Sequence, residues 1–286
     1  MIFLDGELSQ AELDPATARY RVIPVPLERT VSYGAGTAGG PDAILEASVE
    51  LERLWRGAEP CAAGIVTEPP VVCEGPLHLV MQRIAERTRA AVAAGKVPVV
   101  LGGEHSLSYG AVRGVIAASD GPVGVVQIDA HADLRHDYQG ERHSHASVMR
   151  LLAGEDGVAI AQYGVRAMSS EEAEARKALG VIACDGEALA QGAMPVLPED
   201  FPERIYVSFD VDGLDPSVMP ATGTPVPGGL GFWQSIHLLE RLCHGRRIVG
   251  IDVVELAPEP GSRVSDFTAA QIVYALIGLE RQLAGL

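Results

Sequence analysis

The feature that most constrains this fold is an apolar run, residues 123–128, that leads directly into three side chains able to bind a metal. Asp129, His131 and Asp133 occupy alternate positions, and alternate residues of an extended backbone point to the same face. They would therefore converge at the carboxyl end of a strand with little rearrangement. A lone carboxylate after a strand is usually a turn residue or a helix N-cap, but three alternating ligands indicate a metal site.

The same arrangement recurs at the end of other apolar runs. Residues 204–210 end in Asp210 and are followed by Asp212, and His105 and Glu255 each follow a further apolar segment. Strand-like segments alternate with helical patterns along the chain, which predicts a parallel sheet with helices on both faces. Such sheets bind ligands outside the carboxyl ends of their strands, so these side chains are expected to meet there.

The helical segments are recognisable from their periodicity and their boundaries. A helix is expected over residues 41–55, because Pro41 suits the first helical position. Apolar residues recur at helical spacing over residues 77–92, and the chain closes with a helix over residues 266–283. No linker, repeat or low-complexity tract interrupts the pattern, so residues 1–286 are predicted to form a single domain of the α/β class.

Composition limits the classes of partner and the compartment. The 286 residues carry a formal net charge of -16, which argues against nucleic acid and anionic membranes because both are polyanions. The four cysteines are scattered and form no Cys-x-x-Cys pair, so neither a zinc knuckle nor a redox motif is indicated. We find no signal-peptide pattern at the N-terminus and no membrane-length apolar run, and expect the protein in the cytoplasm.

A glycine-rich loop near the N-terminus formally contains a dinucleotide-binding pattern at Gly34, Gly36 and Gly39. A functional fingerprint lies tightly between strand and helix and is followed by an acidic residue at the end of the next strand. Here residues 28–33 separate the strand from the glycines, and no such acid follows. We therefore interpret this segment as a surface loop that leads into a helix.

The number and chemistry of the candidate ligands favour a pair of divalent ions. Six ligands exceed the need of one tetrahedral zinc, and a carboxylate-rich site with some imidazole suits manganese better than zinc or copper. Four aspartates cannot lie close together in ionised form without a large compensating positive charge, which two ions would provide. The six are His105, Asp129, His131, Asp133, Asp210 and Asp212.

At these residues the chain resembles the ureohydrolase family, which includes arginase and agmatinase. The matching segments are residues 102–106, 129–133 and 208–216. The resemblance implies a three-layer α/β/α fold with a central, mostly parallel eight-stranded sheet, and two Mn²⁺ per subunit. It implies that one metal is held by His105, Asp129, Asp133 and Asp210 and the other by Asp129, His131, Asp210 and Asp212.

The resemblance also implies catalytic roles for three residues. Asp133 would orient the nucleophilic water, His145 would act as a proton shuttle, and Glu255 would bind the substrate guanidinium. Considered alone, His145 is more typical of an exposed loop, as are His136 and His143 nearby. The implied reaction is hydrolysis of a small cationic guanidino compound to urea and an amine, by a homo-oligomer, either a trimer or a hexamer.

Within the family the sequence is most similar to agmatinases. Arginases usually have an asparagine after the metal motif, where this chain has Arg135, and we expect that side chain to point away from the substrate. Agmatine, cleaved to putrescine and urea, is therefore the expected substrate. Other activities stay open: guanidinobutyrase, aminopropylagmatine ureohydrolase, arginase, a single-zinc deacetylase-like enzyme of the same fold, or a two-metal phosphohydrolase.

Overall fold

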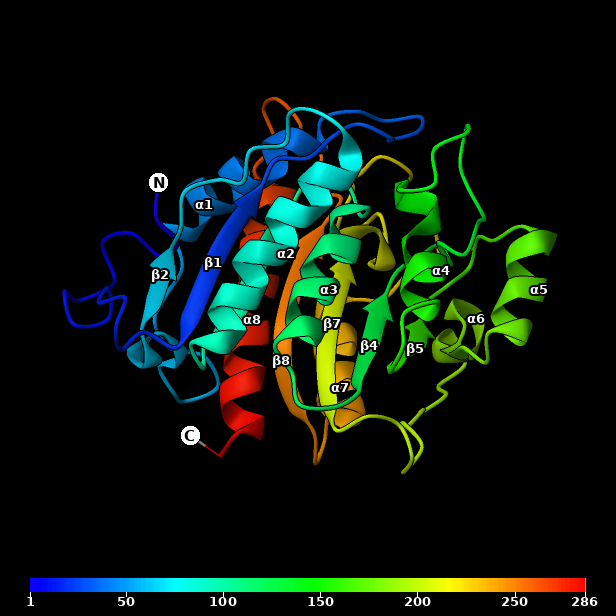
Figure 1. Cartoon of the computed structure of the whole chain (residues 1–286). Coiled ribbons are helices and arrows are strands. Elements are labelled where there is room, and N and C mark those ends of the chain that lie inside the picture. Colours follow the sequence, from blue (N-terminus) through cyan, green and yellow to red (C-terminus); the bar gives the residue numbers. More distant parts are fainter. Residues whose placement is uncertain (286) are drawn as a thin grey trace.

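The structure, a computed structural model that describes residues 1–285, is built on one sheet of eight strands (Figure 1). Every strand pairing is parallel, in the order β2-β1-β3-β8-β7-β4-β5-β6. The strands are β1 Tyr20–Val25, β2 Ile65–Thr67, β3 Val97–Gly102, β4 Val123–Ile128, β5 Val158–Tyr163, β6 Ile182–Cys184, β7 Arg204–Asp210 and β8 Arg247–Val254. The eight-stranded α/β sheet expected from the sequence is confirmed, and it is parallel throughout.

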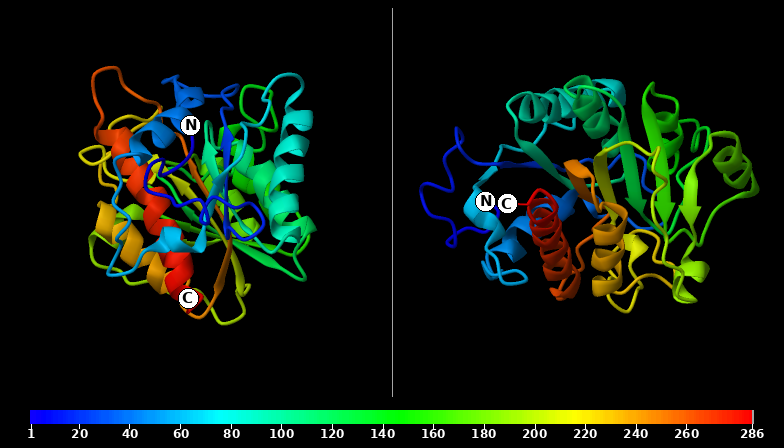
Figure 2. Two further views of the ribbon diagram at one scale, coloured as in Figure 1. Left: turned by 90° about the vertical axis from the view of Figure 1, so that its left-hand side faces the viewer. Right: turned by 90° about the horizontal axis from the view of Figure 1, so that it is seen from below.

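Helices cover both faces of the sheet, so the three-layer arrangement is also confirmed (Figure 2). One face carries α2 (Leu77–Ala93), α3 (Leu107–Ala117) and α4 (Val148–Ala153), and the other carries α1 (Gly40–Ser48), α7 (Phe232–Leu242) and α8 (Val264–Leu283). Two short helices, α5 (Ser170–Ala178) and α6 (Gly186–Ala190), lie near the β6 edge. Every residue of β3 and β4 is buried, as expected for strands covered on both faces.

Helix boundaries differ from the sequence prediction in two places. The helix expected over residues 41–55 ends at Ser48, and Trp55 instead packs against Gly278 of α8, where a Cβ would lie 2.4 Å from the indole. The apolar character of Trp55 thus serves a contact between elements, which helical periodicity does not reveal. The segment that begins at His145 forms a 3₁₀ turn (η3, His145–Ser147) before α4, and the sequence pattern did not indicate α6.

The glycine-rich loop wraps around a carboxylate of the chain itself. Glu28 Oε2 accepts hydrogen bonds from the backbone N–H groups of Gly36 at 2.8 Å and Ala38 at 2.9 Å, and from Thr37 Oγ1 at 3.1 Å. The donors that would bind a phosphate in a dinucleotide fold are therefore already occupied by an internal anion. This explains physically why the formal dinucleotide pattern does not form such a site.

Strand order decides where the candidate ligands meet. β3, β8, β7 and β4 are four consecutive strands at the centre of the sheet, and their carboxyl ends precede His105, Glu255, Asp212 and Asp129. Across residues 1–285, none of the helices combines the length and the apolar character that crossing a bilayer requires.

Candidate metal centre and active site

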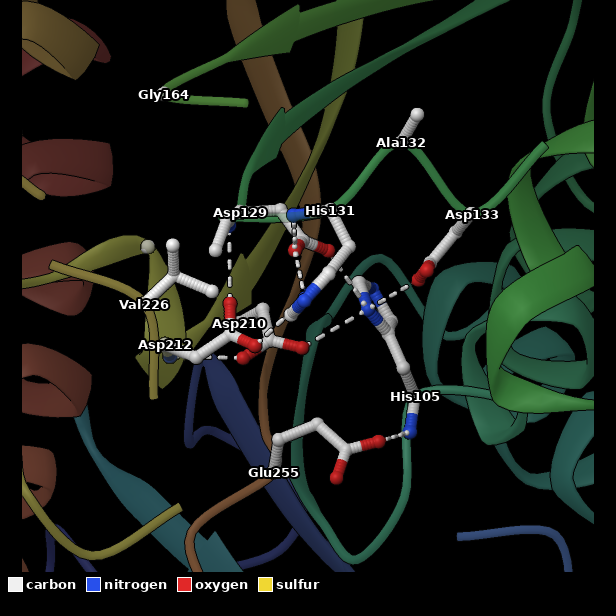
Figure 3. A network of polar contacts seen from close by, with 12 residues as sticks. His105, Asp129, His131, Ala132, Asp133, Gly164, Asp210, Asp212, Val226 and Glu255 are labelled. Atoms are coloured by element: carbon white, nitrogen blue, oxygen red, sulfur yellow. Dashed lines mark hydrogen bonds and ion pairs between the residues drawn. The ribbon is translucent and has the colours of Figure 1, made fainter. Parts of the chain in front are cut away.

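Three carboxylates surround the imidazole of His105 (Figure 3). Its Nδ1 lies 3.1 Å from Asp129 Oδ2, 3.1 Å from Asp133 Oδ2 and 3.2 Å from Asp210 Oδ2. All of these side chains are buried. The ligand atoms of His105, Asp129 and Asp210 lie close enough together to hold one ion, and Asp133 stands beside this trio.

A second trio shares Asp129 with the first. His131 Nδ1 lies 2.9 Å from Asp212 Oδ2 and 3.7 Å from Asp129 Oδ1. The ligand atoms of Asp129, His131 and Asp212 again lie within reach of a single ion. The structure thus brings together all six residues predicted from the sequence, as two adjoining clusters bridged by Asp129.

The orientation of His105 leaves one ring nitrogen for a metal. Its Nε2 lies 2.9 Å from Ser208 Oγ, and that hydroxyl donates to Asp252 Oδ1 at 2.8 Å. Ser208 therefore accepts the Nε2–H, and Nδ1 is the ring nitrogen that faces the carboxylates. Among the described residues this buried Nδ1 has no hydrogen-bond partner. A ring fixed through its second nitrogen is the usual arrangement of a metal-binding histidine.

The electrostatics of the cluster also call for positive charge. Burial, together with the carboxylates of Asp133 and Asp212, raises the pKa of Asp129 to about 7. Burial, together with the carboxylates of Asp212 and Asp129, raises the pKa of Asp210 well above its ordinary value. Burial works against a charged His131 ring, but Asp212 outweighs it and raises the pKa of His131 to about 10. Without a metal the site must retain protons that divalent cations would replace.

The residues therefore fit divalent metal ions. The orphaned Nδ1, the bridging carboxylate and the carboxylate-rich donor set agree in this. His105, Asp129 and Asp210 could hold one ion, with Asp133 next to it, while Asp129, His131 and Asp212 could hold another.

Two site residues have unusual backbone conformations. Asp133 has φ 52° and Glu255 has φ 65°, the left-handed region that a residue with a Cβ adopts at a cost of about 1–3 kcal/mol. Glu255 is fixed there by donating its N–H to Gly103 O at 2.9 Å, while its Oε1 accepts the His105 N–H at 2.6 Å. Burial raises the pKa of Glu255 to about 8. The strain aims both carboxylates at the cavity beside the clusters.

His145 lies in the same cavity, on η3 beyond the strand ends. Its ring stands edge-on to Tyr138 with the centroids 5.3 Å apart. Burial lowers the pKa of His145, and the negative charges of Asp133 and Glu104 only partly offset this. His136 and His143 do not line the cavity; they pair with Asp137 and Glu141 in the loop before η3.

The cavity beside the clusters has a volume of about 300 Å³ and is also lined by Arg135. Arg135 Nε lies 3.8 Å from Glu172 Oε2, and the guanidinium is 5.8 Å from the Tyr138 ring. Arg135 is thus paired with Glu172, but its side chain borders the cavity, contrary to the expectation that it points away from the substrate. The far end of a bound ligand would meet both a cation and a carboxylate.

Two polar networks supporting the site were not anticipated. Gln127 Nε2 donates to Asp129 Oδ2 at 2.6 Å, and Gln162 donates to Gln127 Oε1 at 2.6 Å. The guanidinium of Arg166 donates to backbone carbonyls around the second cluster, including Asp212 O at 2.7 Å and Val226 O at 2.7 Å. A glutamine two residues before Asp129 in an apolar strand was a usable signal for the first network. Arg166 lies in an ordinary loop and gave none.

The central strands of this all-parallel α/β sheet end in adjoining carboxylate–histidine clusters beside a cavity. This arrangement defines a class of α/β proteins that hold divalent ions at the strand ends. Known proteins narrow the class. The sequence model of the Arginase family matches residues 18–278. The N(1)-aminopropylagmatine ureohydrolase of Thermus thermophilus is 39% identical, covering 94% of this chain and 92% of the relative.

Two further relatives agree. An agmatinase of Pyrococcus horikoshii is 33% identical, covering 93% of this chain and 94% of the relative. The crystal structure of an agmatine ureohydrolase of Thermoplasma volcanium superposes with a TM-score of 0.83 at 30% identity, covering 96% of this chain and 94% of that chain. The chain belongs to the arginase family and is an agmatinase-like amidinohydrolase.

Proposed function

We propose that this chain is a binuclear manganese enzyme that hydrolyses agmatine to putrescine and urea. The observation that carries the proposal is the pair of adjoining clusters bridged by Asp129, beside a cavity that also contains Glu255 and His145. The carboxylate-rich donor set favours Mn²⁺ over zinc or copper. When bound, two divalent ions supply the charge that activates water for attack on a guanidinium carbon.

The residues of the chain would bind and orient the substrate. Glu255 keeps one carboxylate oxygen on the His105 N–H, which leaves the other to accept hydrogen bonds from the planar guanidinium. Asp133 would orient the water, and its position beside His105 supports this role. His145, at the cavity wall, would give a proton to the departing amine. His145→Asn should therefore slow turnover by about 10²–10⁴-fold and keep the metals.

A second candidate substrate is N(1)-aminopropylagmatine. The Thermus relative bears that name, and the far end of the cavity has a carboxylate, Glu172, that could attract the additional amine. Because Glu172 is already paired with Arg135, its attraction for an amine is reduced. A carboxylate tail, as in arginine or 4-guanidinobutyrate, would have to compete with Glu172 for Arg135.

A substrate panel tests the proposal. We would measure kcat/KM for urea release from agmatine, N(1)-aminopropylagmatine, arginine and 4-guanidinobutyrate with the manganese-loaded protein. Agmatine should exceed arginine by about 10³-fold or more, because an unpaired buried carboxylate costs several kcal/mol. Arginine within tenfold of agmatine would overturn the assignment to agmatine.

The variant Arg135→Met further distinguishes substrates with an amine tail from substrates with a carboxylate tail. Removing the cation should improve the two amine-tailed substrates or leave them unchanged, and should weaken the two carboxylate-tailed ones. If the parent enzyme prefers 4-guanidinobutyrate and the Arg135→Met variant does not, Arg135 binds the carboxylate tail of the substrate.

We also propose a homo-oligomer, a trimer or hexamer, on the resemblance to the family. Light scattering coupled to size-exclusion chromatography would decide this, and a monomer over the whole concentration range would contradict it.

A further inference from the structure

A buried carboxylate outside the metal clusters organises the loop that faces His145. Glu104 is fully buried. Its Oε2 accepts the backbone N–H groups of Arg29 and Thr30, both at 2.6 Å, and its Oε1 accepts the hydroxyls of Ser106 at 2.5 Å and Thr30 at 2.9 Å. All four partners are donors, which is the pattern of an ionised carboxylate. The metal clusters and the proposed chemistry leave this group without a role.

The hydroxyl of Thr30 connects Glu104 to His145. Thr30 Oγ1 lies 3.2 Å from His145 Nδ1 and 3.0 Å from the backbone N of His145, which donates to it. A threonine hydroxyl has one hydrogen to donate and two lone pairs. Because a charged carboxylate is a stronger acceptor than a neutral ring nitrogen, the hydrogen goes to Glu104. The two lone pairs of Thr30 then accept the backbone N–H and the ring Nδ1–H of His145.

We infer that Glu104 and Thr30 form a positioning relay that holds neutral His145 in its Nδ1–H tautomer, with the Nε2 lone pair directed toward Ser32. Ser32 Oγ lies 3.4 Å from that Nε2, and both residues line the cavity. Thr30 and Glu104 touch neither the metal ligand atoms nor the cavity in this arrangement, and so act through His145. The inference rests on the proposed function for its kinetic consequence, but the tautomer can be observed without it.

The relay defines the path of the proton. Nε2 would take up a proton from solvent and give it to the nitrogen of the departing amine, and Nδ1–H would keep its proton throughout. While Nε2 is protonated, the imidazolium would be stabilised through Thr30 by the negative Glu104. The His145 ring would keep its orientation and its tautomer between turnovers, because Nδ1–H stays hydrogen-bonded to Thr30 Oγ1. The backbone N–H of His145 donates to the same oxygen and holds it in place.

The direct test is ¹⁵N NMR of the full chain labelled at histidine and free of paramagnetic metal. The His145 signals are assigned from their loss in His145→Asn. At mildly alkaline pH we expect Nδ1 to have the shift of a protonated nitrogen and Nε2 that of an unprotonated one. Thr30→Val, which keeps the shape of the side chain and removes the hydroxyl, should abolish this preference. A parent protein with Nε2 protonated in its neutral form would overturn the inference.

The kinetic test uses the manganese-loaded enzyme and a double-mutant cycle. Thr30→Val should lower kcat by about 10–100-fold, the range found for partners that orient metal-binding histidines, with KM and metal content unchanged. Thr30→Ser, which keeps the hydroxyl, should recover most of the loss. In the His145→Asn background the Thr30→Val penalty should shrink to about twofold or less.

Thr37→Val is the matched control. It removes a buried threonine hydroxyl from another carboxylate contact of the same region, that with Glu28, and should leave kcat unchanged. An equal Thr30→Val penalty with and without His145 would mean that Thr30 acts on structure alone, and the relay would be rejected. A parent enzyme that releases no urea from any guanidino compound would refute the proposed function, and the NMR result would then decide the relay by itself.

Discussion

At the scale of single residues, the site is arranged by backbone N–H groups and by neutral polar side chains. Asp129 Oδ1 accepts the His131 N–H at 2.6 Å, and Asp210 Oδ1 accepts the Asp212 N–H at 2.8 Å. One oxygen of each carboxylate is thus fixed by its own chain. The other points toward a histidine nitrogen, so the carboxylates are oriented before any cation arrives.

Ser208→Ala should weaken metal binding at the first cluster by about 10–100-fold. The variant removes the acceptor that fixes the His105 ring, so Nδ1 would no longer be held as the free nitrogen. Metal retained per chain after dialysis against graded manganese would measure the change. Ser235→Ala removes another buried hydroxyl, one that donates within α7, and should leave metal affinity at the parental value. Equal metal retention in Ser208→Ala and the parent would contradict the orienting role.

At the scale of elements, the position of the site depends on helices that hold the central strands in place. The contact between α2 and α3 is unusually close at Gly114. A Cβ there would lie 2.0 Å from Thr88 Oγ1 and 2.2 Å from Ala85 O. The helix α3 that begins just after His105 can therefore approach α2 only with glycine at this point.

Gly114→Ala should destabilise the protein although alanine is the better helix former. The propensity gain is about 1 kcal/mol, but overpacking against the α2 backbone costs about 1–3 kcal/mol and Thr88 would also lose its hydrogen bond to Ala111 O. We expect a lower thermal midpoint by differential scanning calorimetry. Ala117→Ser, at an exposed position of the same helix, should change the midpoint little. A midpoint raised in Gly114→Ala would show that α3 shifts without cost.

At the scale of the whole molecule, four aspartates buried at one site add a local charge repulsion to a chain whose net charge is already -16. Divalent cations would relieve this repulsion in the folded state only. Removing them should therefore affect stability as well as activity.

Chelation should abolish urea release and lower the thermal midpoint, and manganese should restore both. A ligand at 100 times its Kd stabilises the folded state by about 2.7 kcal/mol, which corresponds to several degrees for a chain of this length. Metal analysis, calorimetry and activity would be compared before chelation, after it, and after re-addition. Full activity in the stripped protein, or one zinc per chain in the active form, would refute the two-manganese proposal.

Acid should weaken the contact that ties the N-terminal segment to the rest of the fold at Glu12. The Arg53 guanidinium, 2.7 Å from Glu12, lowers the pKa of that carboxyl from 4.5 to about 2. Because the folded pKa is the lower one, the pair stabilises the protein above about pH 4.5, and this contribution is lost as the pH falls toward 2.

Glu12→Gln should therefore be less stable than the parent at pH 7, by about 1.5–3 kcal/mol for a hydrogen bond to a charged group. The difference should disappear near pH 2. Denaturant midpoints of the two proteins across this range would measure it. A difference that stays constant with pH would show that the ion pair does not carry the effect.

The sequence by itself determined the parallel α/β class and most of the strands. Apolar runs and helical periodicity report burial, and burial is what distinguishes a covered strand from a loop. The sequence also identified the six candidate ligands. Asp129, His131 and Asp133, for example, alternate on extended backbone and need no distant partner to share a face. The roles of these residues stay predictions, and so does the assignment of residues 1–286 to a single domain.

Only the tertiary structure decided what depends on distance between segments. Packing decides the strand order that makes β3, β8, β7 and β4 neighbours. It also decides that Asp129 belongs to both clusters and that α1 ends at Ser48. Thr30 reaches His145 across 115 positions of the chain, and nothing in its local sequence signals that contact. Local pattern specifies which face of an element is buried, but the three-dimensional contacts of that face decide what it touches.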